Sequence, residues 1–346
     1  MNKNKTKSRC TTSRHRGSST KSGQKIVTIG GGSGSFMVLS GLKKYPAELS
    51  AIVTMSDDGG STGVLRDELG VLPPGDVRQC LVALSQSSQV LRKLFNYRYD
   101  NGGLGGHSFG NIFLSTLEKI TGGLDLAIEE AGRILRIRGQ VLPVTLKNTR
   151  LIAVLKNGKK IIGEKNIYCY KNNFSDFKKL YLKPRAELNP EIFKVLKEAG
   201  KIIINPGDIY SSLIPNFLVK GLPEAIARAN AKVIYVANLM TKPGQTDNFI
   251  LNDYIFTLEK YLGKGIIKYV IFNTELPDSK LLKKYARQGE KPVNPGDFKK
   301  LPGVKFLGYK LLSREIYKTD KNDALSRQRS LIRHDPNKLA KIIYNL

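Results

Sequence analysis

The feature that most constrains the fold is a repeated order of short apolar run, glycine-rich turn and helical pattern. Residues 25–29 form a β-branched run, and residues 30–35 read GGGSGS. Apolar residues then recur at helical spacing over 36–42. A second apolar run at 49–55 ends in DDGGSTG at 57–63. This order predicts parallel strands whose carboxyl-end loops face one crevice.

The same rhythm returns late in the chain, with apolar runs at 201–204, 233–237 and 266–272. Between the two halves the hydrophobic period shifts towards 2, and Asn157-Gly158 marks a hairpin turn. We therefore predict an α/β fold with a doubly wound, mostly parallel sheet. One domain is expected over residues 25–346, with an antiparallel β insertion at about 141–182.

The formal net charge of +28 is concentrated in part at the start of the chain. Residues 1–24 combine lysine and arginine with Ser, Thr and Asn and contain no acidic residue, which predicts a disordered basic tail. Elsewhere lysine replaces other polar types without the interleaved aromatics of a nucleic-acid groove. We expect no nucleic-acid partner, although the basic surface leaves that alternative open.

The cysteine content and hydropathy indicate a cytoplasmic protein. Three scattered cysteines do not form a disulfide framework, and no run of 18 apolar residues is present. Residues 1–24 also lack the apolar region of a secretory signal. We expect a cytoplasmic location and no membrane span.

The glycine-rich loop at 30–35 is a candidate anion site. Glycines allow backbone N–H groups to approach a phosphate closely, and Ser33 and Ser35 add hydroxyl donors. The helix that follows presents unpaired N–H groups and the positive end of its dipole. A phosphate or a diphosphate is the expected ligand, and a tight turn without a ligand is the alternative.

Asp57 and Asp58 follow the second strand directly. They could hold a metal ion such as Mg²⁺, bond a ribose or sugar hydroxyl, or act as a base. Two adjacent carboxylates repel each other unless something offsets the charge, and Arg66 or Arg78 would do so without a ligand.

Two further segments carry polar residues near predicted helix starts. Asp76 is a plausible N-cap, and Arg78 would project towards the crevice. His107 is a candidate acid, base, phosphate donor or packing residue, and Asn111 follows it. With so few histidines, a histidine-based metal site is not expected.

Polar loops also follow the strands at 201–204 and 233–237. So many polar and glycine residues at one sheet edge predict a shared ligand site. No Ser-His-Asp order or Walker lysine motif can be assembled.

Six segments in order resemble the 2-phospho-L-lactate transferase family and its bacterial relatives, the YvcK-type gluconeogenesis factors. They are GGGSGS at 30–35, SDDGGSTG at 56–63, LPPGDVR at 72–78, GHSFGN at 106–111, NPGDIYSSLIPN at 205–216 and NLMTKPGQTD at 238–247. The resemblance implies a Rossmann-like fold over residues 25–346. For the gluconeogenesis-factor branch it implies binding of a UDP-sugar, notably UDP-N-acetylglucosamine.

The transferase branch, which joins phospholactate from a guanylylated donor to a deazaflavin, usually carries a Cys-Pro-Asp-Leu-Asp-Thr run that this chain lacks. The regulatory branch is therefore preferred, with a role in carbon metabolism, cell-wall precursor supply and cell shape. The chain departs from the family pattern at Val64, Gln79, Asn205 and Asp208. Tyr285 and Arg333 resemble late segments that contact the sugar nucleotide.

We thus expect a nucleotide-sugar-binding regulator, a homo-oligomer with a regulatory protein partner, and hold a phosphoryl-linked group transferase as the alternative. Asp57, Asp58 and His107 are the catalytic candidates, and Asp57 or Asp58 would hold a metal. The expected ligand-binding residues are Gly31, Gly32, Ser33, Gly34, Ser35, Asp57, Asp58, Gly59, Gly60, Ser61, Arg78, His107, Asn111, Gly207, Tyr210, Ser211, Asn238, Thr241, Tyr285 and Arg333.

Overall fold

A computed structural model describes residues 23–170, 177–298, 301–314 and 331–346. Most of the predicted basic tail, residues 1–22, lies outside these ranges. The boundary expected at residue 24 is nevertheless wrong, because Gln24 is already the first residue of strand β1.

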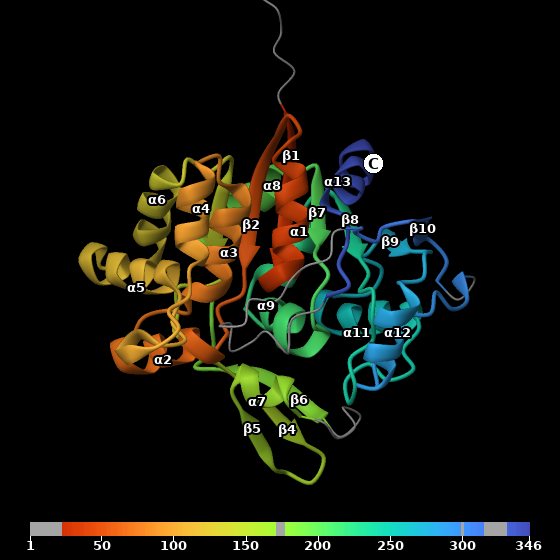
Figure 1. Ribbon diagram of the computed structural model, residues 1–346. Coiled ribbons are helices and arrows are strands. Elements are labelled where there is room, and N and C mark those ends of the chain that lie inside the picture. Colours follow the sequence, from red (N-terminus) through yellow and green to blue (C-terminus); the bar gives the residue numbers. More distant parts are fainter. Residues whose placement is uncertain (1–22, 171–176, 299–300, 315–330) are drawn as a thin grey trace, which may run out of the picture.

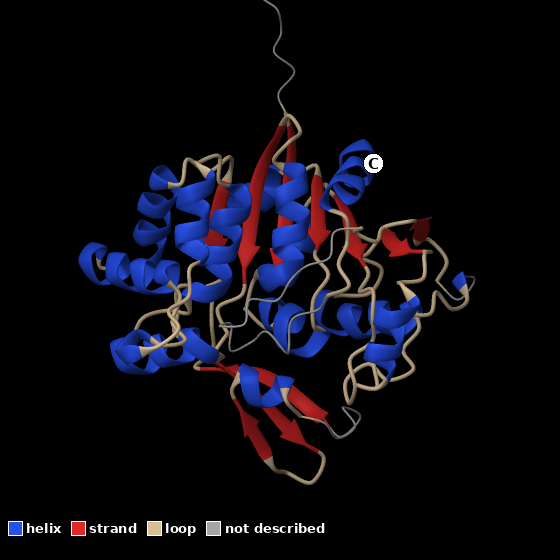
Figure 2. Ribbon diagram, viewed as in Figure 1, coloured by secondary structure: helices blue, strands red, loops and turns tan. Residues whose placement is uncertain are grey.

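A central sheet forms the middle layer of the molecule (Figures 1 and 2). Its strand order is β10-β9-β8-β7-β1-β2-β3, and every neighbouring pair is parallel. The strands are β1 (Gln24–Gly30), β2 (Ala47–Val53), β3 (Gln140–Pro143), β7 (Lys201–Ile204), β8 (Lys232–Val236), β9 (Tyr269–Asn273) and β10 (Lys305–Tyr309). The predicted doubly wound sheet is confirmed, and its order reverses between β1 and β7, where such folds form their binding crevice.

Helices cover both faces of this sheet, as Figure 1 shows for α1 in front and α8 behind. In the first half of the chain they are α1 (Gly32–Leu42), α2 (Gly60–Leu69), α3 (Pro74–Leu84), α4 (Gln89–Asn96), a short turn η1 (Gly102–Leu104), α5 (Phe109–Thr121) and α6 (Leu124–Ile134). The second half adds α8 (Pro190–Glu198), the π-helical turn η3 (Ile209–Leu213), α9 (Ile214–Phe217), α10 (Leu222–Arg228), α11 (Leu251–Leu262), α12 (Ser279–Ala286) and α13 (Pro336–Asn345).

A separate antiparallel sheet lies beyond the carboxyl ends of the main strands (Figures 1 and 2). It contains β4 (Arg150–Leu155), β5 (Lys160–Ile162) and β6 (Phe177–Lys183), and α7 (Glu164–Tyr168) follows β5. The predicted Asn157-Gly158 turn joins β4 to β5, with Gly158 at φ 84°.

The expected start of this insertion at residue 141 is wrong. Residues 140–143 form β3, which pairs in parallel with β2 at the edge of the main sheet. Hydrophobic alternation marks a strand with one covered face, but it does not reveal which sheet the strand joins. The antiparallel part begins at Arg150.

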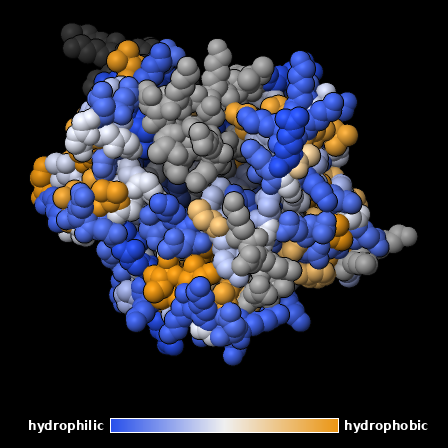
Figure 3. All heavy atoms as spheres, turned by 60° about the horizontal axis from the view of Figure 1, so that its bottom comes forward, coloured by the Kyte–Doolittle hydropathy of each residue, from blue (hydrophilic) through white to orange (hydrophobic). Residues whose placement is uncertain are grey.

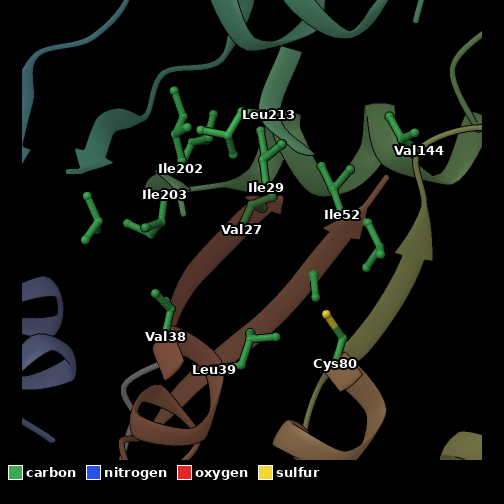
Figure 4. Close-up of a cluster of buried hydrophobic side chains, with 14 of the residues drawn as sticks. Val27, Ile29, Val38, Leu39, Ile52, Cys80, Val144, Ile202, Ile203 and Leu213 are labelled. Carbon is green, nitrogen blue, oxygen red and sulfur yellow. The ribbon is translucent and has the colours of Figure 1, made fainter. Parts of the chain in front are cut away.

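The hydrophobic core occupies both sides of the main sheet (Figure 4). Ile29, Ile52 and Leu213 lie on one side of the strands, while Leu39 of α1 and Cys80 of α3 lie on the other. All five are at most 1% exposed. Burial on both faces explains why the central strands read as continuous apolar runs.

Within the described residues, no helix is both long enough and apolar enough to cross a bilayer.

Candidate functional site

A cavity of about 370 Å³ opens at the carboxyl ends of the central strands, at the point where the strand order reverses. The loops after β1, β2, β7 and β8 line it, together with α7 of the small sheet and residues 285–290 and 332–334. Figure 3 shows this end of the molecule as a largely hydrophilic surface, with a broad hydrophobic patch in the lower part of the view and smaller hydrophobic areas towards the left and right edges. The loops predicted to share a crevice do meet there.

The glycines after β1 allow the loop to lie directly against its neighbours. A Cβ atom on Gly31 would come within 2.1 Å of Asp76 Oδ2, and one on Gly34 within 1.8 Å of Pro206 O. Gly32 has φ +59°, a conformation that side chains disfavour. These glycines are therefore required for the packing of the β1 and β7 loops around the cavity.

Helix α1 begins inside this loop, with Gly31 as N-cap in an extended conformation. Gly31 has no side chain to cap the helix, and the first turn contains no acidic residue, but the carboxyl group of Asp76 accepts a hydrogen bond from Gly32 N–H. The next N–H groups, those of Ser33 and Gly34, and the positive end of the helix dipole lie at the cavity wall. Such a helix start suits a phosphate group.

Asp57 and Asp76 place two carboxyl groups next to this helix start. Asp57 Oδ1 accepts a 2.9 Å hydrogen bond from Gly59 N, and burial raises its pKa. Burial also raises the pKa of Asp76 to about 7, and the charge of Asp57 adds to this effect. The pair can therefore hold a proton near neutral pH and release it when a cation arrives.

The expectation that Asp76 is the N-cap of α3 is wrong. Pro73 is the N-cap, and Asp76 lies in the first turn, buried against Gly31 and Gly32. Proline at the first helical position, Pro74, moves the helix start upstream of Asp76. The carboxylate is thereby directed to the cavity.

Asp58 turns away from the cavity and attaches the small sheet. Its Oδ1 accepts a 2.7 Å hydrogen bond from Lys165 N, and its Oδ2 lies 3.8 Å from Arg150 Nη1. These contacts place α7 over the mouth of the site. The charge of Asp58 is thus offset by Arg150 of the insertion, which the sequence did not suggest. The predicted Arg66 also contributes, because its charge acts on both Asp57 and Asp58.

Lys242 is the main buried cation of the cavity. Its Nζ lies 3.6 Å from the ring centroid of Tyr168, a cation–π contact that joins the loop after β8 to α7. Burial lowers the pKa of Lys242, but Asp208, Tyr168 and Glu290 together raise it above its usual value. Lys242 therefore stays charged and is placed to bind an anion.

Carboxylates outnumber basic groups in the lining. Asp57, Asp76, Glu164, Asp208 and Glu290 face the cavity beside the cations Lys165, Lys242 and Arg333. Burial raises the pKa of all five carboxyl groups, and the charges of Asp57 and Asp58 add to this effect for Glu164, whose pKa lies well above its usual value. A diphosphate ligand would require that some of these groups be protonated or bridged by a cation.

The donor chemistry fits Mg²⁺, which prefers carboxylate and phosphate oxygens and keeps several waters. No group of three or more acidic, His or Cys side chains within the described residues is arranged to hold a metal by itself. Asp57 and Asp76 would each supply a carboxylate, and phosphate oxygens and water the remaining positions. The ion would neutralise phosphate charge.

The structure places twelve of the predicted ligand-binding residues on the cavity wall. They are Gly31, Gly32, Ser33, Gly34, Asp57, Gly59, Gly207, Ser211, Asn238, Thr241, Tyr285 and Arg333. The other eight do not line it: Ser35, Asp58, Gly60, Ser61, Arg78, His107, Asn111 and Tyr210. Their ligand contacts, like those of the first group, stay predictions.

Ser35 and Tyr210 have structural partners. Ser35 Oγ donates to Gly31 O at 3.2 Å and accepts from Asn205 Nδ2 at 2.9 Å, which joins the loops after β1 and β7. Tyr210 packs edge-on against Phe177, with 6.3 Å between ring centroids.

Four of the predicted residues form a hydrogen-bond chain beside the cavity. Arg78 Nε donates to Asn111 Oδ1 at 2.9 Å, and Asn111 Nδ2 donates to Ser61 Oγ at 3.2 Å. Ser61 Oγ lies 3.1 Å from His107 Nδ1. The chain connects α3 and α5 to the start of α2 and so supports the loop that carries Asp57. Arg78 does not project into the crevice.

Several cavity residues were missed by the sequence reasoning. Asp76 and Lys242 lie inside two of the six segments that resemble the family, at 72–78 and 238–247. Those segments were therefore the sequence signal that could have identified them. Glu164, Lys165 and Tyr168 come from the insertion, and no local pattern marks them.

A family model described as 2-phospho-L-lactate transferase CofD matches residues 26–315. The chain belongs to the CofD family. It is 42% identical over 323 residues to a putative gluconeogenesis factor of Nostoc sp., covering 93% of this chain and 68% of that protein. It is 37% identical over 324 residues to the gluconeogenesis factor of Bacillus subtilis, covering 93% and 98%.

The fold also resembles a solved structure of this group. Protein BH3568 from Bacillus halodurans has a TM-score of 0.83 and 34% sequence identity, with 93% of this chain and 99% of that chain covered. The resemblance to the gluconeogenesis-factor branch of the CofD family is thereby confirmed.

Proposed function

We propose that this CofD-family protein is a regulator that binds a nucleotide sugar of the UDP-N-acetylglucosamine type in the cavity. Its regulatory role would concern carbon metabolism, cell-wall precursor supply and cell shape. The observation that carries the proposal is the convergence of the β1, β2, β7 and β8 loops on one cavity that contains the start of helix α1.

The cavity offers each part of such a ligand a suitable partner. The N–H groups around Gly31 to Gly34 would bind the diphosphate, with Lys242 as its cation. Asn238 and Thr241, from the loop after β8, are polar residues of the cavity wall. A volume of about 370 Å³ falls within the range of small-molecule sites.

Calorimetry with UDP-N-acetylglucosamine tests the proposal, with and without Mg²⁺. UDP should bind more weakly than UDP-N-acetylglucosamine, because it lacks the sugar. UMP should bind more weakly still, because the loop recognises the diphosphate. GDP serves as the control for the base. Absence of heat and of a thermal shift at millimolar UDP-N-acetylglucosamine would contradict the proposal.

A phosphoryl-linked group transfer of the phospholactate transferase type is the second candidate, favoured by the carboxyl pair. The pKa of about 7 for Asp76 would allow a carboxylate beside the phosphate loop to accept a proton at neutral pH. Formation of product from a guanylylated phospholactate and a deazaflavin, abolished by Asp57→Asn, would support this reading. A protein that binds the nucleotide sugar without forming product would be a regulator only.

The predicted homo-oligomer, protein partner and cytoplasmic location also remain proposals. Light scattering on the purified chain would measure the oligomeric state directly.

A further inference from the structure

A second recess, of about 1070 Å³, lies on the helical face of the molecule. It is bounded by the end of α1, by α4 with residues 96–100 after it, and by residues 313–314 with the start of α13. Figure 1 shows α1 between α3 and α4 on one side and α13 on the other. No lining residue is shared with the strand-end cavity, so the two sites are separate.

The charge of this second recess is strongly positive. Seven basic side chains line it and two acidic ones. The basic residues are Lys43, Lys44, Arg92, Lys93, Arg98, Arg314 and Lys338. Of the acidic residues, Asp335 already caps α13 by accepting from the N–H groups of Asn337 and Lys338, and Asp100 is exposed.

The ammonium groups of three of these lysines donate to uncharged oxygens. Lys43 Nζ lies 2.7 Å from Ser85 O, Lys44 Nζ 2.6 Å from Asn337 Oδ1, and Lys338 Nζ 3.2 Å from Leu312 O. Burial, with the charges of Arg92 and Lys44, lowers the pKa of Lys43 to about 8. The cations therefore repel one another, and a bound anion would relieve that repulsion.

The recess also has an aromatic surface. Two aromatic residues line it. Phe36 is half-buried and packs against the core, whereas Tyr97 is 51% exposed and lies edge-on against Tyr99. Single-stranded nucleic acids are bound by successive aromatic platforms along a groove. One exposed ring in a recess enclosed by α1, α4 and α13 fits one base, and several converging cations fit more than one phosphate.

We propose that this recess binds a nucleoside polyphosphate, with its phosphates on Lys43 and Lys44 after α1 and on the basic side chains of α4, and its base on Tyr97. The ligand is thus a second one, distinct from the occupant of the strand-end cavity.

Lysine footprinting on the full chain separates the two sites, with ATP and inorganic tripolyphosphate as probes. Acetylation at Lys43, Lys44, Lys93 and Lys338 is followed by mass spectrometry at constant ionic strength. Lys242 reports on the strand-end cavity, and the exposed Lys260 is the reference. We expect ATP to slow acetylation at the recess several-fold and to leave Lys260 unchanged. Protection of Lys242 alone would overturn the proposal.

Charge reversal provides the matched variants. Arg92→Glu/Lys93→Glu should weaken ATP binding by at least about tenfold, because charge-assisted contacts to phosphate are lost. Lys260→Glu/Lys264→Glu makes the same change in net charge on an exposed part of the surface and should have little effect. Equal losses in both double variants would overturn the proposal, because net charge alone would then explain binding.

Tyr97→Ala tests the nucleoside part without altering charge. It should weaken ATP binding several-fold and leave tripolyphosphate binding unchanged. An equal effect on both probes would contradict a base on Tyr97. Tighter binding of a single-stranded RNA or an acidic peptide than of ATP, with the same lysines protected, would reassign the recess to a macromolecular partner and overturn the proposal.

Discussion

Replacement of Asp76 by asparagine tests the electrostatics of the cavity most directly. Folding buries this carboxyl group beside Asp57 and raises its pKa from 3.8 to about 7. Between these values the folded protein holds a proton that the unfolded chain releases. The contribution of Asp76 to stability is therefore fully present below pH 3.8 and is lost as the pH rises to about 7.

The size of the effect follows from the pKa difference. A rise from 3.8 to about 7 corresponds to about 4 kcal/mol of unfolding free energy at pH 8. Asparagine is uncharged at every pH and retains an oxygen that can accept from Gly32 N–H. Asp76→Asn should therefore be more stable than the wild type by up to about 4 kcal/mol at pH 8 and by little at pH 4.

Urea unfolding followed by circular dichroism at pH 4, 5, 6, 7 and 8 measures this difference. Asp100→Asn is the matched control, because it makes the same chemical change at an exposed position. The difference in unfolding free energy between Asp100→Asn and the wild type should not grow in the same way as the pH rises. A difference for Asp76→Asn that is constant from pH 5 to pH 8, or a loss of stability at pH 8, would refute the reasoning.

Three further substitutions test the loops around the cavity. Gly34→Ala should lower the unfolding free energy measured in urea by roughly 1–3 kcal/mol and abolish nucleotide-sugar binding, because its Cβ would overlap the carbonyl oxygen of Pro206 in the β7 loop. Gly103→Ala is the control and should have neither effect, because its Cβ would meet open space. Ser35→Ala should lower the unfolding free energy by about 1 kcal/mol, because it leaves the side-chain amide of Asn205 without its acceptor. A loss of binding free energy in calorimetry that exceeds this loss of unfolding free energy would show that the hydroxyl contacts the ligand instead. Lys242→Met should weaken UDP-N-acetylglucosamine at least about tenfold, since it removes the buried cation of the site; unchanged affinity would place the diphosphate elsewhere.

The strand-and-loop order was predictable because its signals are local. Apolar β-branched runs and glycine-rich turns mark β1 and β2, and the predicted limits, 25–29 and 49–55, lie close to the observed Gln24–Gly30 and Ala47–Val53. Parallel strands bring their carboxyl ends to one edge, so the meeting of the loops followed from the order alone.

The direction of individual side chains was not predictable in the same way. Ser33 and Ser35 look equivalent in the sequence, but Ser33 faces the cavity and Ser35 bonds the β7 loop. Asp76 is compatible with a helix cap or a cavity wall, and the position of Pro74 in the folded chain decided between them. These choices depend on neighbours that are distant in sequence.

The sequence alone determined a doubly wound sheet with glycine-rich loops at the carboxyl ends of its strands, because hydrophobic period and glycine placement are properties of contiguous residues. The tertiary structure alone decided that α7 lines the site, that β3 joins the main sheet, and that carboxyl groups with raised pKa values outnumber the cations in the cavity wall. Burial and charge proximity depend on segments more than a hundred residues apart, and no local pattern encodes them.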